Sequence, residues 1–177
     1  MKKLIECVPN FSEGRDLDKI NSIVDVMSNV DQVTILDVDP GIDTNRTVVT
    51  MVGSPNSISE SIFRGIKLAS QILDMSNHVG THPRMGATDV CPFIPISGVS
   101  NEECIKISKE VGKRVGEELA IPVFLYEKSA TSLNREKLPD IRKGEYEGLS
   151  DKLNHPDWKP DFGPRKVHIR AGAIAMG

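Results

Sequence analysis

The feature that most constrains the fold is the alternation of two hydrophobic periods along residues 1–126. Apolar residues recur three and four positions apart in two segments, as on the buried face of a helix, whereas the other apolar runs are short and end at Pro or Gly. The predicted elements are a strand at 4–8, a turn at 10–14, a helix around 20–27, a strand at 33–38, a strand at 46–52, a helix at 55–73 and a strand at 90–96. This β-α-β-β-α-β order predicts a ferredoxin-like α+β fold, in which two helices cover one face of a four-stranded antiparallel sheet.

An extra helix and strand follow this unit. A capping-box pattern at Ser100 and Glu103 opens the helix, and residues 123–126 form the strand. Beyond residue 126 the periodicity fades. We therefore expect a core of residues 1–126 followed by an irregular C-terminal segment, 127–177.

Charge and hydropathy exclude two classes of protein. The chain has 22 Lys and Arg against 25 Asp and Glu, a net charge of -3, whereas nucleic-acid binders normally have a basic excess. No apolar run approaches the roughly 18 residues that span a bilayer, and the first residues contain no signal-peptide core. We expect a cytoplasmic protein that binds neither nucleic acid nor membranes.

The cysteines and paired histidines give little support for reactive thiols or a metal. Cys7, Cys91 and Cys104 have no CxxC spacing, which favours reduced core thiols over a nucleophile. His78 and His82 are four residues apart, but the glycine and proline around them argue against a helix, and no third ligand has a standard spacing. The sequence therefore predicts no metal site.

The loop around His82 is the strongest candidate for chemistry. His82 precedes Pro83, which favours an extended backbone, and the loop opens into a strand, where reactive groups often lie. From the residues alone, a surface or structural histidine is the more common use of such a position. Arg84 is suited to holding an anion and Asp89 to orienting an imidazole, although each is equally suited to an ion pair. Asp39 ends a strand before a tight turn, where turn capping is the alternative.

Three blocks of sequence carry a resemblance to a known family. They are Glu-Cys-Val-Pro-Asn-Phe-Ser-Glu-Gly at 6–14, His-Pro-Arg-Met-Gly-Ala-Thr-Asp-Val-Cys-Pro-Phe-Ile-Pro at 82–95 and Pro-Asp-Phe-Gly-Pro at 160–164. The chain resembles the formiminotransferases, also called glutamate formimidoyltransferases. The resemblance implies transfer of a formimino group from N-formimino-L-glutamate to N5 of tetrahydrofolate, a step of histidine degradation and one-carbon metabolism. It also implies that residues 1–177 form the N-terminal subdomain of a two-lobed unit that binds folate between its lobes.

The resemblance also implies roles for particular residues. His82 falls on the family's catalytic histidine, and Asp39 and Arg84 are expected to position the substrate. Imidazole suits a reaction that moves a proton from the attacking amine to the departing one, since its ordinary pKa of about 6.5 is near neutral pH. The family's folate-contacting loop falls on Gly163, Pro164, Arg165, Lys166, Val167, His168, Ile169, Arg170, Ala171 and Gly172. Basic side chains of this loop are suited to the glutamyl carboxylates of folate.

Two features lead to expectations about partners. The last residues, 171–177, are small and apolar, so we expect a C-terminal formiminotransferase subdomain to follow. The family forms dimers, so we expect a homodimer. Two alternatives to the transferase remain: a folate-binding or interaction module that is inactive without the second lobe, and a variant of the same scaffold that handles formyl folates.

Overall fold

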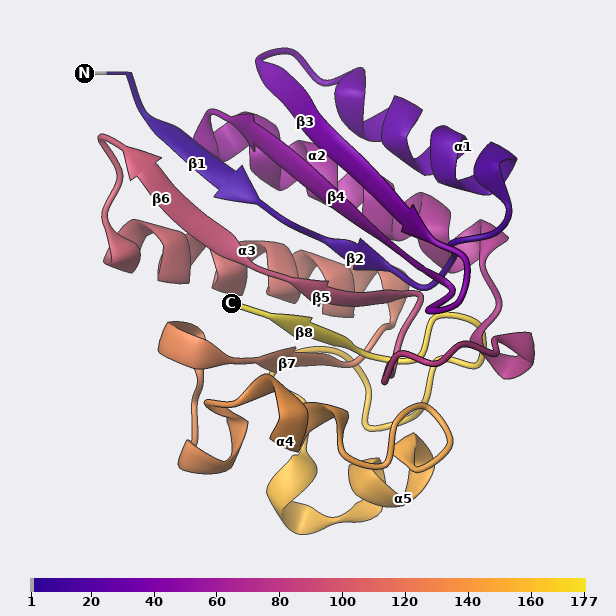
Figure 1. Ribbon diagram of the computed structural model, residues 1–177. Coiled ribbons are helices and arrows are strands. Elements are labelled where there is room, and N and C mark those ends of the chain that lie inside the picture. The colour runs from indigo at the N-terminus through magenta and orange to yellow at the C-terminus, as the bar shows by residue number, and fades with distance from the viewer. Residues whose placement is uncertain (1) are drawn as a thin grey trace.

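The computed structural model describes residues 2–177, which form an eight-stranded sheet and five α-helices (Figure 1). The strands are β1 (Leu4–Cys7), β2 (Asn10–Phe11), β3 (Val33–Gly41), β4 (Arg46–Gly53), β5 (Thr88–Cys91), β6 (Phe93–Ser97), β7 (Val123–Leu125) and β8 (Ile174–Met176). The helices are α1 (Leu17–Ser28), α2 (Pro55–Ile72), α3 (Asn101–Leu119), α4 (Leu138–Arg142) and α5 (Leu149–Asn154). Within residues 2–177, no helix combines the length and apolar character needed to cross a membrane.

The strand predicted at 90–96 is divided into β5 and β6, and the strand predicted at 4–8 is β1, which is followed by a second short strand, β2. β1 and β2 both pair antiparallel with β4. On their other side, β1 pairs antiparallel with β6, and β2 pairs antiparallel with β5. The breaks fall at Pro9 and Pro92, because proline lacks the N–H that the strand ladder needs. The turn predicted at 10–14 was partly wrong, since it begins with β2. β3 pairs with the free side of β4 and forms one edge of the sheet.

The C-terminal segment departs most from the prediction. Residues 127–177 are not wholly irregular: they contain α4, α5 and β8. β8 lies between β5 and β7 and pairs parallel with both, so the sheet is mostly rather than entirely antiparallel. Three small or apolar residues are too short a run to display a strand period. Their burial from both faces of the sheet, with Ala175 and Met176 at 0% exposure, arises only from the tertiary fold.

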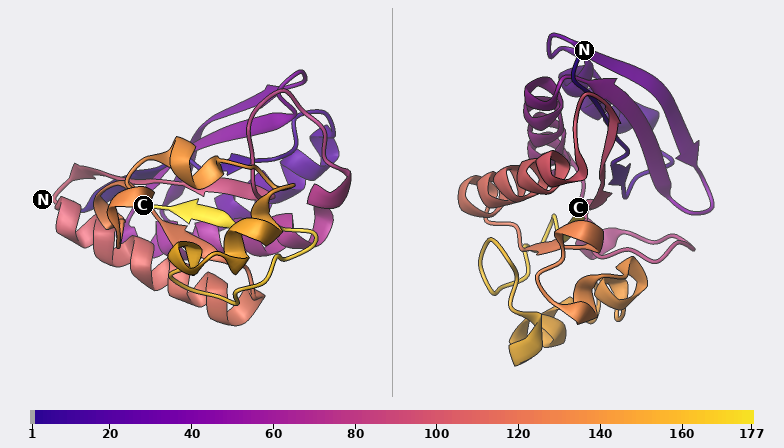
Figure 2. Two further views of the ribbon diagram at one scale, coloured as in Figure 1. Left: turned by 90° about the horizontal axis from the view of Figure 1, so that it is seen from below. Right: turned by 90° about the vertical axis from the view of Figure 1, so that its left-hand side faces the viewer.

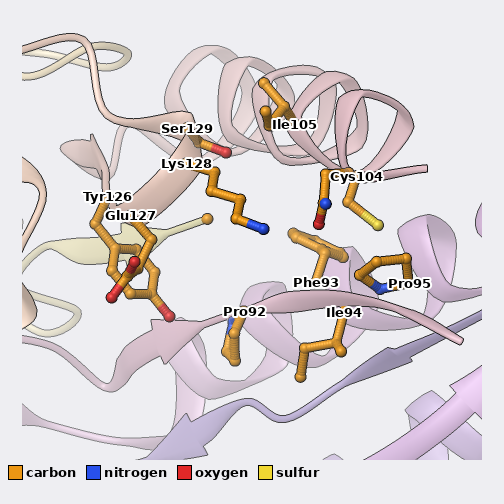
Figure 3. A pocket seen from close by; sticks show the side chains of 12 residues that line it. Pro92, Phe93, Ile94, Pro95, Cys104, Ile105, Tyr126, Glu127, Lys128 and Ser129 are labelled. Carbon is orange, nitrogen blue, oxygen red and sulfur yellow. The ribbon is translucent and has the colours of Figure 1, made fainter.

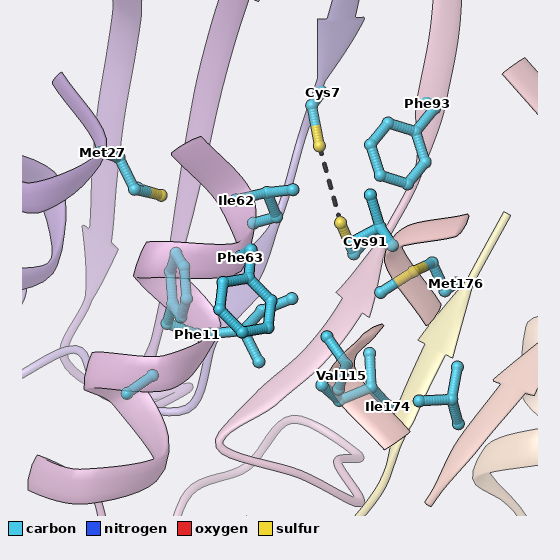
Figure 4. Packing of buried hydrophobic residues seen from close by; sticks show 14 of the residues in the cluster. Cys7, Phe11, Met27, Ile62, Phe63, Cys91, Phe93, Val115, Ile174 and Met176 are labelled. Carbon is cyan, nitrogen blue, oxygen red and sulfur yellow. Dashed lines mark hydrogen bonds between the residues drawn. The ribbon is translucent and has the colours of Figure 1, made fainter. Parts of the chain in front are cut away.

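Helices α1, α2 and α3 cover one face of the sheet, as the two side views show (Figure 2). Their N-caps are Asp16, Ser54 and Ser100, and the capping box of Ser100 with Glu103 is confirmed. The main core lies between these helices and the strands and includes Phe11, Met27, Ile62, Phe63, Val115 and Ile174 (Figure 4). Burial of this apolar face is the dominant stabilising term for such a layered domain.

The opposite face of the sheet is covered at one end only. Helices α4 and α5 pack over β5, β7 and β8, around Phe124, Ile141 and Leu153. In Figure 1, the front of β1, β3, β4 and β6 carries no helix. Leu36 on β3 and Ile96 on β6 are 57% and 55% exposed. The second face therefore has a covered part and an open part, and their boundary lies beside β5.

The three cysteines are buried and unpaired, as predicted. Cys7 Sγ and Cys91 Sγ lie 3.6 Å apart in the core (Figure 4), and burial together with this contact raises the pKa of the Cys7 thiol well above its ordinary value. Burial also raises the pKa of Cys104. Because all three thiols are buried and out of reach of the reagent, they are expected to resist Ellman's reagent in the folded protein and to react in guanidinium chloride. Rapid labelling of a native thiol would contradict this.

Candidate functional site

The candidate site lies where the open and covered parts of the second face meet. The loop that precedes β5 brings His82 to the start of β4, and the end of α4 approaches from the C-terminal segment. The side chain of His82 is half-buried. A pocket of about 340 Å³ opens beside it, lined by His82, Pro83, Pro139, Arg142, Lys143, Gly144 and Glu145.

The hydrogen bond of His82 defines its tautomer. Nε2 of His82 lies 2.6 Å from Nη1 of Arg46. A guanidinium can only donate, so Nε2 is the acceptor and the ring proton of the neutral imidazole is on Nδ1. Nδ1 is buried and has no hydrogen-bond partner within residues 2–177. Within residues 2–177, Nε2 is therefore the one ring nitrogen of His82 with a hydrogen-bond partner.

The surroundings keep this imidazole neutral. Burial lowers the pKa of His82 most, and the positive charges of Arg46 and Arg142 lower it further. The backbone carbonyl of Pro83 and the carboxylate of Asp89 oppose these effects. The net lowering means that His82 is unprotonated at neutral pH, which is the state that a general base requires.

Arg142 owes its position to a buried carboxylate. Asp89 is 0% exposed, and its Oδ2 accepts a hydrogen bond of 2.8 Å from Nε of Arg142, while Oδ1 accepts one of 2.7 Å from the backbone N–H of Met85. Asp89 was predicted to suit the orientation of an imidazole or an ion pair, and its direct side-chain partner is this arginine. Arg46 and Arg142 were both missed, because no local pattern distinguishes them from surface arginines.

Arg84 lies in an ion-pair network. Its guanidinium is bonded to Glu145 at 2.9 Å, to Glu147 at 2.7 Å and to Nδ1 of His78 at 3.0 Å. The side chain is 8% exposed. The structure therefore shows Arg84 in an ion pair, and its role in positioning the substrate stays a prediction. Through this ion pair, the His82 loop is joined to residues 143–147.

Asp39 is exposed on β3 and is paired in register with Val48 of β4. Its carboxylate is close enough to Arg46 to favour the charged guanidinium. The structure therefore brings Asp39, Arg46 and His82 to one place, on the side of the sheet that carries no helix.

The loop of residues 163–172 approaches the site only at its end. The backbone N–H of Ala87 donates to the carbonyl of Ala171 at 3.0 Å. Gly172, at φ +65°, lies so close to the backbone that a Cβ there would be 2.0 Å from the Met85 carbonyl oxygen. Arg165 and Arg170 donate to the backbone carbonyls of Asn154 and Leu73, at 2.8 and 3.3 Å. No residue of this loop lines the His82 pocket.

The sequence of the chain matches a known protein family. Residues 4–177 match the formiminotransferase domain, N-terminal subdomain. The chain belongs to the formiminotransferase family. It is 52% identical over 177 residues to a formimidoyltransferase-cyclodeaminase of Dictyostelium discoideum, and 49% identical over 177 residues to a glutamate formimidoyltransferase of Streptococcus pyogenes serotype M1. All of this chain is covered in both alignments, but it spans 33% and 59% of those relatives' own lengths. A glutamate formimidoyltransferase of Thermoplasma acidophilum is 47% identical over 176 residues, 98% of this chain and 58% of the relative.

A second pocket of this formiminotransferase subdomain lies away from His82. It has about 240 Å³ and is mostly apolar, between β6, the start of α3 and residues 126–129 (Figure 3). Phe93, Pro95, Cys104 and Ile105 contribute to its wall. None of the site residues predicted from the sequence lines it. Within residues 2–177, no cluster of His, Cys, Asp or Glu is arranged to hold a metal ion.

The Arg84 network leads to a prediction for acid stability. The hydrogen bond from Arg84 lowers the pKa of Glu147 from 4.5 to about 2. A lowered carboxylate pKa stabilises the fold above pH 4.5, and this contribution is lost as the pH falls towards 2. Glu147→Gln is expected to lower Tm at pH 6 and not at pH 2, because the ionised carboxylate contributes only at the higher pH. The decrease in Tm at pH 6 is expected to be small, because Glu147 is 65% exposed and solvent screens the ion pair. Glu110→Gln, in an exposed pair with Lys106, is the control. An equal loss of Tm at both pH values would contradict the assignment.

Proposed function

We propose that this chain is the N-terminal lobe of a glutamate formimidoyltransferase, which transfers a formimino group from N-formimino-L-glutamate to N5 of tetrahydrofolate. The observation that carries the proposal is the neutral imidazole of His82, which lines a pocket together with Arg142 and whose Nε2 is its one hydrogen-bonded ring nitrogen within residues 2–177. A neutral base beside positive charge suits an anionic substrate whose reaction requires proton transfer. Membership of the family supports the same conclusion.

The proposed chemistry assigns one proton path. N5 of tetrahydrofolate attacks the amidine carbon of the donor and forms a C–N bond, and N5 then loses its proton to Nε2 of His82. The protonated imidazole returns that proton to the α-nitrogen of glutamate, and the bond between this nitrogen and the formimino carbon breaks. No net proton is gained or lost. Acid-base assistance of this kind contributes about 100- to 10,000-fold to a rate.

The second lobe belongs on the open part of the sheet in this proposal. Strands β6, β1, β4 and β3, with α1 and α2 behind them, support a ferredoxin-like organisation for the first lobe. Exposed Leu36 and Ile96 give the open face apolar area that a C-terminal subdomain would bury. Folate would lie between the lobes, bordered by residues 163–172, with Asp39 facing the donor and Arg84 holding the His82 loop. A homodimer and a cytoplasmic location stay predictions of the sequence.

The decisive experiment measures turnover with and without a second lobe. The 177-residue chain and a fusion to the C-terminal half of a glutamate formimidoyltransferase are each given N-formimino-L-glutamate and tetrahydrofolate, and product is followed chromatographically. We expect turnover by the fusion and little by the chain alone, because a site with half its walls missing admits water and positions substrates poorly. Turnover with N-formyl-L-glutamate only would favour the formyl variant. Folate binding without turnover by the fusion would favour the binding module.

A further inference from the structure

Arg46 has a half-buried positive charge with no carboxylate partner. Within residues 2–177, no acidic oxygen lies within 4.0 Å of its guanidinium, and its hydrogen bond is made to His82. The other arginines of low exposure are all neutralised, Arg84 by Glu145 and Glu147, Arg135 by Asp161 and Arg142 by Asp89. Buried charges in proteins are normally paired, so a half-buried guanidinium without a carboxylate partner is suited to binding an anion.

The charges around Arg46 favour an anion that comes from outside. Burial, followed by the nearby charge of Arg142, lowers the pKa of Arg46, and this repulsion is offset only in part by Asp89 and Asp39. Arg46 begins β4, whose odd-numbered residues are buried under the helices and whose even-numbered residues point to the other face. A ligand therefore reaches the guanidinium from the open part of the sheet, on the same side as the pocket of His82.

Arg46 also blocks the base that it accompanies. A neutral imidazole has one ring lone pair, and at His82 this lone pair is on Nε2 and accepts from Nη1 of Arg46 at 2.6 Å. In this arrangement Nε2 has no free lone pair with which to take a proton. A carboxylate is a stronger acceptor for a guanidinium than an imidazole is, because the hydrogen bond is charge-assisted on both sides. A bound carboxylate would draw the guanidinium away and release Nε2.

We propose that Arg46 binds a carboxylate of the donor substrate, and that this binding frees Nε2 of His82 to act as the base. The inference rests on the proposed function, because it assigns the ligand of the same site. It makes Arg46 a specificity-determining residue: an amidine without a carboxylate would leave His82 blocked. The ligand class is a dicarboxylate amino acid or its N-substituted derivative.

The test uses glutarate as the probe and NMR of the 177-residue chain labelled with ¹⁵N-histidine. We expect His82 to have its proton on Nδ1 in the free protein, and glutarate to move the Nε2 resonance towards that of an imidazole nitrogen without a hydrogen bond. Arg46→Ala is expected to show that resonance position without ligand and to bind glutarate at least about tenfold more weakly. Arg64→Ala removes the same charge from the surface of α2 and is expected to behave as wild type.

Each outcome decides the proposal. Unchanged glutarate affinity in folded Arg46→Ala, or an Nε2 resonance that does not move at saturation, would overturn it. If Arg46→Ala fails to fold, Arg46→Gln is neutral and of similar length, and it is expected to give the same loss of affinity. The readout involves no turnover. A normal glutarate response in a protein whose two-lobed fusion transfers no formimino group would reject the proposed function while leaving the carboxylate site in place.

Discussion

His82→Ala in the two-lobed enzyme is expected to lower kcat for formimino transfer by about 100- to 10,000-fold, because the reaction loses the group that moves the proton from N5 of tetrahydrofolate to the departing nitrogen. Product formation from N-formimino-L-glutamate under saturating conditions measures this effect. Near-normal turnover would remove His82 from the mechanism.

Two companion measurements separate proton transfer from structural damage. His155→Ala alters an exposed histidine beside Asp157 and is expected to leave kcat unchanged. The wild-type pH profile provides the second. His82 must be neutral to act as the base, and burial with Arg46 and Arg142 lowers its pKa below 6.5, so activity should persist to a more acidic pH than an ordinary histidine allows. An acidic limb at or above pH 6.5 would conflict with this assignment.

Arg142→Met is expected to destabilise the fold by about 3–5 kcal/mol, because it leaves the carboxylate of Asp89 buried and without its ionic partner. Urea unfolding followed by the fluorescence of Trp158, the single tryptophan, measures the change. The backbone N–H of Met85 still donates to Asp89, but one neutral donor does not replace a guanidinium.

A control and a rescue make this result specific. Lys106→Met breaks an exposed pair with Glu110 and is expected to cost less than about 1 kcal/mol. Adding Asp89→Leu to Arg142→Met removes the unpaired charge and is expected to recover part of the loss. A cost for Arg142→Met no larger than that for Lys106→Met would mean that Asp89 is not held as a buried charge.

The elements that could be predicted are those with a local cause. Serine at the N-caps of α2 and α3 satisfies free backbone N–H groups, and apolar spacing marks the buried stripe of each helix, so both helices were placed correctly. β8 could not be placed, since three residues show no period and their strand neighbours are distant in sequence. For the same reason, the parallel pairing of β8 with β5 and β7 could not be predicted, nor could the packing of α4 and α5 over that end of the sheet.

The candidate site divides in the same way. The amino-acid sequence by itself determined that a histidine held before proline, in a glycine-rich loop ahead of a strand, is the group to examine, and its family resemblance is confirmed. Only the tertiary structure decided that Arg46 meets this imidazole, that Asp89 pairs with Arg142, and that Arg84 binds two glutamates. The physical reason is that periodicity and caps depend on neighbours within a few residues, whereas the charge around a side chain depends on groups that folding brings from distant parts of the chain.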